Sequence, residues 1–148
     1  MNSQLTIAAH ILGVLAHRDG KPVTSDALAQ TFGTNPVVIR RVLSQLKQAG
    51  LIDSRRGQGG GSVLARAPKD INLRHAYEAI TAADDTLFRR HPGRCAHGVA
   101  PIIAGYINDL YADAEQAFLR RLEAVTVAEM NREIIRRVGG APPLNGCD

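Results

Sequence analysis

Tryptophan is absent from this sequence of 148 residues, and its three tyrosines and three phenylalanines make up only 4% of the chain. A buried core must therefore be built mainly from Leu, Ile, Val and Ala, which favours packed helices over a large sheet. The chain is long enough to bury such a core without disulfide bonds. We therefore predict a mostly α-helical protein, organised as one domain or as a small domain with an appended oligomerisation element.

Cysteine is also scarce, because Cys95 and Cys147 are the only two in the chain. They are too few and too badly placed for the disulfide framework of a small secreted protein. The apolar N-terminal stretch lacks a preceding basic segment and is interrupted by His10 and His17. It predicts a buried amphipathic helix over residues 3–17 rather than a signal peptide or a membrane span. We expect a cytoplasmic protein with no membrane partner.

Positive charge is unevenly distributed along the chain, whose net charge is +4. Residues 1–70 contain nine Lys and Arg against four Asp and Glu, whereas residues 71–148 contain nine against ten. An excess of cations in one region is what binding to phosphate groups requires. The alternative is a basic face that only meets solvent.

The segment from Thr24 to Arg66 has the order of a winged helix-turn-helix. Thr24 can cap a short helix that ends near Phe32, with Asp26 placed in its first turn where a carboxylate favours the helix dipole. Asn35-Pro36 can open a second helix, because Asn is a good cap and Pro suits the first helical position. Gly50 stands where a left-handed residue would end that helix.

The helix that follows Asn35 has two opposite faces. Its apolar residues fall within one arc and predict the buried face: Ile39, Val42, Leu43 and Leu46. The opposite face combines two guanidinium groups with small and polar side chains: Val37, Arg40, Arg41, Ser44 and Gln48. Such a face can bind guanine through arginine and a thymine methyl through a small apolar group. The alternative is an ordinary solvated helix face.

Two short strands are predicted after Gly50, over residues 51–55 and 62–66, joined by a loop that contains four glycines. Because glycine has no side chain, this loop and the adjoining Arg55 and Arg56 could approach a phosphate or the narrow minor groove. A phosphate-binding loop of a nucleotide enzyme is not favoured, since no Lys-Ser/Thr follows and no helix begins there. The full set of residues that we predict to contact DNA is Ser25, Asn35, Val37, Arg40, Arg41, Ser44, Arg55, Arg56, Gln58 and Gly59.

The second half of the chain predicts helices around an irregular loop. Asn72 can cap a helix to about residue 82, and residues 83–98 show no sustained period. An apolar stripe over residues 99–122 is broader than one domain face needs, which predicts a helix that also packs on a second subunit. The alternative is the central helix of a monomeric bundle. A Thr126–Glu129 capping box predicts a last helix to about Val138, and residues 139–148 are predicted to be a disordered tail.

The irregular loop contains Cys95 between His91 and His97. Cationic neighbours, here Arg89, Arg90 and Arg94 in addition to the histidines, lower the pKa of a thiol and favour the reactive thiolate, so Cys95 is a candidate redox sensor. The alternative is a thiol that only packs. A thiol enzyme is not favoured, because no orienting acid and no oxyanion-hole pattern accompany the cysteine.

Residues 1 to about 130 resemble the Rrf-two family of bacterial winged-helix regulators. The resemblance is carried by Arg40-Arg41-Val42-Leu43, by Leu46-Lys47-Gln48-Ala49-Gly50-Leu51-Ile52, by Arg56-Gly57-Gln58-Gly59-Gly60-Gly61 and by Leu64-Ala65-Arg66. It implies a homodimer joined by a long C-terminal helix, with Arg56 as the arginine that enters the minor groove. It also implies that Asn35, Val37, Arg40 and Arg41 are the variable base-reading positions.

One departure from the resembled pattern bears on cofactors. Members of that family that bind a cluster have three cysteines in the loop before the dimerisation helix, and this chain has only Cys95 there. We therefore expect no cofactor, and in particular no iron–sulfur cluster.

The sequence thus predicts a winged helix-turn-helix domain over residues 1–82, an effector or sensor loop over 83–98, and dimerisation helices over 99–138. The predicted function is a homodimeric repressor that binds double-stranded DNA and responds to an oxidant or small molecule, not an enzyme. The alternative is a winged-helix interaction module that no longer reads bases.

Overall fold

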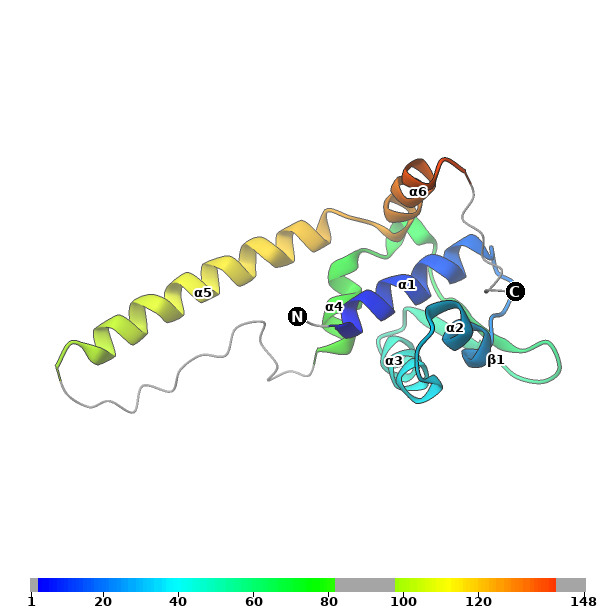
Figure 1. Ribbon diagram of the computed structural model, residues 1–148, viewed down its shortest axis with the longest axis horizontal. Coiled ribbons are helices and arrows are strands. Elements are labelled where there is room, and N and C mark those ends of the chain that lie inside the picture. Colours follow the sequence, from blue (N-terminus) through cyan, green and yellow to red (C-terminus); the bar gives the residue numbers. More distant parts are fainter. Residues whose placement is uncertain (1–2, 82–97, 141–148) are drawn as a thin grey trace.

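The structure is a computed structural model that describes residues 3–81 and 98–140. The described residues form six α-helices, one short 3-10 helix and one two-stranded sheet (Figure 1). In chain order these are α1 (Ser3–His17), α2 (Ser25–Phe32), α3 (Pro36–Gln48), β1 (Ile52–Arg55), β2 (Gly61–Leu64), η1 (Pro68–Asp70), α4 (Leu73–Ile80), α5 (Ala100–Glu123) and α6 (Val127–Val138). The predicted mostly α-helical winged helix-turn-helix is confirmed.

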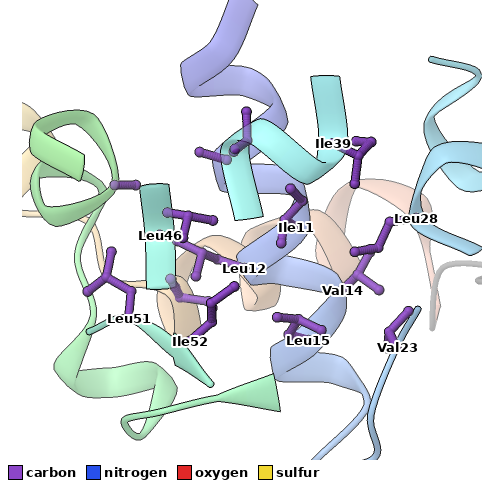
Figure 2. Packing of buried hydrophobic residues seen from close by; sticks show 14 of the residues in the cluster. Ile11, Leu12, Val14, Leu15, Val23, Leu28, Ile39, Leu46, Leu51 and Ile52 are labelled. Atoms are coloured by element: carbon purple, nitrogen blue, oxygen red, sulfur yellow. The ribbon is translucent and has the colours of Figure 1, made fainter. Parts of the chain in front are cut away.

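Helix α1 lies at the centre of the core. It contacts α3, α4, α6 and β2, and Figure 2 shows Ile11 and Leu12 of α1 among side chains from α2, α3 and β1. The fully buried side chains are almost all aliphatic, as the lack of aromatic residues predicts. This core fixes the position of α3 relative to the rest of the domain.

The ends of α2 and α3 are set by the predicted caps. The Thr24 side chain accepts a hydrogen bond from the N–H of Ala27 at 3.2 Å, and Asn35 Oδ1 accepts one from the N–H of Val37 at 2.9 Å. These side chains satisfy donors that have no partner inside the helix. Gly33 and Gly50, which follow the two helices, have φ values of +57° and +68°.

The two strands form the predicted antiparallel wing, with Ile52 opposite Leu64 and Arg55 opposite Gly61. Strand β1 begins one residue later than the predicted span of 51–55 and ends where predicted. Strand β2 begins one residue earlier and ends two residues earlier than the predicted span of 62–66. Leu51 precedes the strand because its N–H donates to Leu46 at the end of α3, at 3.0 Å. Ser62 also pairs with Val23, through N–H···O bonds of 3.0 and 2.8 Å, which ties the wing to the segment before α2.

Helix α6 folds back on α1 of the same chain. It begins directly after the predicted cap Thr126, whose side chain accepts a hydrogen bond from the N–H of Glu129 at 3.1 Å. Val127 is fully buried in the central core, and the Asn131 side chain donates to the carbonyl oxygen of Gly13 at 3.1 Å. The core therefore extends beyond residue 82, where the sequence suggested that the domain ends.

Helix α5 extends from the rest of the protein in Figure 1. None of its 24 residues is buried, and its apolar side chains are exposed at Ile102, Ile103, Tyr106, Ile107, Leu110 and Tyr111. The predicted helix over residues 99–122 is confirmed. None of the described helices combines the length and apolarity that a membrane span needs.

Candidate nucleic-acid interface

The outer face of α3 is not covered by the described part of the protein. Ile39, Val42 and Leu46 are fully buried on its inner side. On the opposite side Arg40, Arg41 and Ser44 are exposed, and Val37 has 65% of its surface exposed to solvent. An exposed valine beside two arginines is a surface with apolar and cationic contacts available to a ligand.

Two of the residues predicted to contact DNA, Asn35 and Ser25, lie at the N-terminal ends of helices. Asn35 is the N-cap of α3, so any contact it makes to DNA must coexist with its hydrogen bond to Val37. Ser25 is the first residue of α2 and is half-buried. Both stand at helix N-termini, where free N–H groups favour a phosphate.

Arg40 forms an ion pair that sequence reasoning missed. Its Nη2 lies 3.1 Å from Oδ1 of Asp26 on α2, and 59% and 72% of the two side chains are exposed. Because the pair is so exposed, it is worth at most about 1 kcal/mol. It therefore orients the guanidinium without preventing it from leaving for a stronger partner. The only feature of the sequence that could have indicated this ion pair is the carboxylate of Asp26 in the first turn of α2.

The tip of the wing is a tight turn. The N–H of Gly60 donates to the carbonyl oxygen of Gly57 at 3.0 Å, which places Gln58 and Gly59 at the two central positions. Gly59 has φ +75°, the conformation that the second central position of a type II turn requires. Gln58, Gly59, Arg55 and Arg56 are all exposed. The wing therefore exposes the amide side chain of Gln58 and two guanidinium groups to solvent.

The glycines of the wing meet different structural requirements. A Cβ at Gly60 would overlap the carbonyl oxygen of Arg55, and one at Gly61 would lie 2.6 Å from the backbone of Val23. Sequence reasoning explained the glycine run by access to DNA. The structure shows that Gly60 and Gly61 are required by the protein's own packing, while Gly57 and Gly59 adopt positive φ.

Together, α3 and the wing supply four arginines, short polar side chains and backbone N–H groups, which are donors suited to phosphates and base edges. The fold and this surface define a winged helix-turn-helix DNA-binding protein.

Comparison with known proteins gives the family. Residues 1–133 match the sequence profile of Rrf2, described as an iron-dependent transcriptional regulator, and the chain belongs to this family of DNA-binding transcriptional regulators. YwnA of Bacillus subtilis strain 168, assigned as a helix-turn-helix transcriptional regulator, is 41% identical over 91 residues. That match covers 62% of this chain and 65% of YwnA, slightly less than two thirds of that relative.

Solved structures agree on the fold. A protein of Lactobacillus plantarum assigned as a transcriptional regulator superposes with a TM-score of 0.73 at 27% identity, covering 90% of this chain and 91% of that one. CymR, the global cysteine regulator of B. subtilis, superposes with a TM-score of 0.69 at 20% identity, covering 90% and 96%. The latter likeness shows the shared fold alone.

The family description raises the question of iron. Both cysteines of the chain lie outside the described residues, and within residues 3–81 and 98–140 no three His, Cys, Asp or Glu side chains are grouped to hold a metal. The described residues therefore offer no donor set for iron or a cluster. The predicted sensor residues Cys95, His91 and His97 also fall outside the described ranges, as does the predicted tail beyond Gly140.

Proposed function

We propose that this protein is a homodimeric, sequence-specific transcriptional repressor. In each subunit α3 enters the major groove, where Arg40 and Arg41 bind base edges and Val37 contacts a thymine methyl. Arg56 enters the adjacent minor groove from the wing. Ser25, Asn35, Ser44, Arg55, Gln58 and Gly59 contact the sugar-phosphate backbone or the groove walls.

The observation that carries the proposal is the free outer face of α3. A helix-turn-helix reads DNA with the exposed side of its second helix, and that side is here both cationic and uncovered by the described residues. Val37, which is 65% exposed, precedes Arg40 and Arg41 by one helical turn, so apolar and cationic side chains are neighbours on this face.

The dimer is supported by the apolar side of α5. Ile103, Tyr106 and Ile107 follow helical spacing and remain exposed in the single chain, with Ile103 and Tyr106 exposed to 58% and 64%. A second copy of α5 would bury this stripe in a symmetric contact. Two recognition helices would then meet successive major grooves of a palindromic operator.

The proposal includes a response to an oxidant through Cys95. Arg89, Arg90 and Arg94 lie close to it in the sequence, with His91 and His97 on either side, and cations of this kind stabilise a thiolate. The position of the loop between α4 and the dimerisation helix would let a change at Cys95 alter the spacing of the two recognition helices.

We expect Arg40→Ala and Arg56→Ala each to weaken binding to the operator. Each lost contact costs about 1–3 kcal/mol, and a dimer loses it twice, so affinity should fall by roughly 30-fold or more. The measurement is a gel-shift titration on the protein's own promoter against random duplex at several salt concentrations. Arg40→Ala should reduce the preference for the operator, whereas a lost phosphate contact would lower affinity for both duplexes alike.

Asp26→Asn is the matched control, because it removes the ion partner of Arg40 and leaves the guanidinium in place. It should bind the operator at least as tightly as the unmodified protein. Equal affinity for operator and random DNA, unchanged by Arg40→Ala or Arg56→Ala, would show instead an interaction module that does not read bases.

A further inference from the structure

A pocket of about 440 Å³ opens between α1, α2 and α6, on elements separate from the recognition helix and the wing. Its volume falls within the range of pockets that hold small organic ligands. The consecutive helices α1 and α2 form it together with α6, which is distant in the sequence and packs on α1.

Most of the pocket wall is apolar. The apolar lining comes from α1 and α6: Ala9, Gly13, Val14, Met130, Ile134 and Ile135. Ile134 and Ile135 stay 37% and 38% exposed, which is unusual for isoleucines that face only their own domain. Space at Gly13 is tight, since a Cβ there would lie 3.1 Å from the side chain of Asn131 and 3.3 Å from that of Met130. Helices α1 and α6 are therefore closely packed at this edge of the pocket.

A few polar groups converge on the same space. They are uncharged or weakly basic: Thr6, His10, His17, Thr31 and Asn131. His10 is stacked on Phe32, with ring centroids 3.9 Å apart, so its ring is held in place. Burial lowers the pKa of His10, which favours the neutral imidazole, a form that can both donate and accept a hydrogen bond.

No Asp, Glu, Lys or Arg side chain is among the described residues that line the pocket. Three charged side chains of α6 pair with one another instead: Glu133 accepts hydrogen bonds of 2.7 Å from Arg136 and Arg137, which lower its pKa to about 2. A charged ligand would have to leave water without a counter-ion, which is costly.

We propose that this pocket binds an uncharged small molecule with an apolar body and one hydroxyl or carbonyl group. The apolar body lies against Ala9, Ile134 and Ile135. The polar group is bound by His10, Thr31 or Asn131, the side chains that can exchange hydrogen bonds with it. The residues that line the site are different from those of the proposed DNA-contacting surface.

Ligand binding here would be communicated to both functional parts of the protein, and this step rests on the proposed function. Thr31 belongs to α2, which also holds Arg40 through Asp26. Helix α6 follows α5 directly, and their junction is fixed by hydrogen bonds of 2.8 Å from Val127 to Ile71 and 2.9 Å from Leu73 to Val125. A ligand that prefers one separation of α2 and α6 therefore changes operator affinity.

The test uses 2-naphthol as a neutral hydroxyl probe and 2-naphthoate as its charged counterpart. Because Met130 and Met1 are the only methionines, ¹³C-methyl methionine gives a spectrum with one reporter in the pocket. We expect the Met130 signal of the full chain to shift saturably with 2-naphthol, and 2-naphthoate to bind at least about ten times more weakly. The titration needs no DNA, so it decides the pocket even if operator binding fails.

Two variants locate the binding. Ala9→Phe fills the pocket and Ile135→Asp places a charge in its wall at a partly exposed position that the fold tolerates, so each should weaken 2-naphthol binding at least about tenfold. Ala65→Phe, at an exposed position beside the wing, is the control and should bind normally. The folded state of each variant is checked by circular dichroism, and Ile135→Asp decides if Ala9→Phe does not fold.

Three results would overturn the proposal. The first is a Met130 signal that does not respond saturably to 2-naphthol. The second is unchanged binding by the pocket variants. The third is a Met130 signal that moves on removal of residues 141–148 or on dilution of the protein alone, because the pocket would then be occupied by the chain's own end or by a second copy.

Discussion

Ile103→Asp is expected to convert the protein from a dimer into a monomer and to reduce its affinity for the operator by about 100-fold or more. Ile103 belongs to the exposed apolar stripe of α5, with 58% of its surface uncovered in the single chain. In a dimer two such carboxylates would be buried near each other without cationic partners, which opposes association strongly. The fold of each subunit should remain, since no residue of α5 is buried within the described chain.

Sedimentation equilibrium measures the mass, and a gel shift on the operator measures the affinity. Gln116→Asp is the matched control, because it adds the same charge at an exposed position on the opposite side of α5. It should leave both mass and operator affinity near those of the unmodified protein. A dimeric Ile103→Asp variant at micromolar concentration would place the subunit contact elsewhere and leave α5 without its proposed role.

The parts of this fold that sequence reasoning anticipated are those fixed by local chemistry. Helix caps form where predicted at Thr24, Asn35, Asn72 and Thr126. A short polar side chain just before an apolar helical period can accept a hydrogen bond from a free N–H of the first turn. The buried and exposed faces of α3 were also predicted correctly, since helical periodicity alone separates Ile39 from Arg40.

The parts that were missed depend on how distant segments approach each other. The Arg40–Asp26 pair joins residues on two helices whose crossing no local pattern encodes. The return of α6 to α1 places the side chains of Asn131 and Met130 close to Gly13, and Asn131 donates a hydrogen bond to its carbonyl oxygen. The pocket beside that contact could not be predicted at all, because α1, α2 and α6 form it jointly. Tertiary proximity of this kind leaves no period in the sequence.

The same distinction explains why the glycine run was only half understood. A run of glycines near arginines suggested access to a phosphate, which concerns the ligand. In the structure Ser62 pairs with Val23, and the neighbouring Gly61 lies so close to the Val23 backbone that a side chain would not fit. This requirement concerns the fold. Within residues 57–61, glycine therefore serves both close packing and a turn with positive φ, and only the three-dimensional contacts show which glycine serves which.

Gly61→Ala is expected to destabilise the protein by roughly 2 kcal/mol or more, because the added methyl group meets backbone rather than a movable side chain. Its Cβ would lie 2.6 Å from both the carbonyl carbon and the carbonyl oxygen of Val23, and Gly61 has φ +150°, which side-chain-bearing residues rarely adopt. The strand must therefore move away from Val23 and lose one or both hydrogen bonds of the bridge. Urea denaturation followed by circular dichroism measures the free energy of unfolding.

Gly59→Ala separates this packing effect from the cost of a left-handed backbone. Gly59 has φ +75° with nothing within 4 Å of an added Cβ, so alanine there should cost only about 1 kcal/mol of local strain. Gly61→Ala should be clearly the less stable of the two and should also bind the operator more weakly, since the wing that presents Arg56 is attached to the core through the Val23–Ser62 bridge. Equal stability of the two variants would mean that the wing does not depend on this contact, and that its position relative to α3 is set by the end of α3 alone.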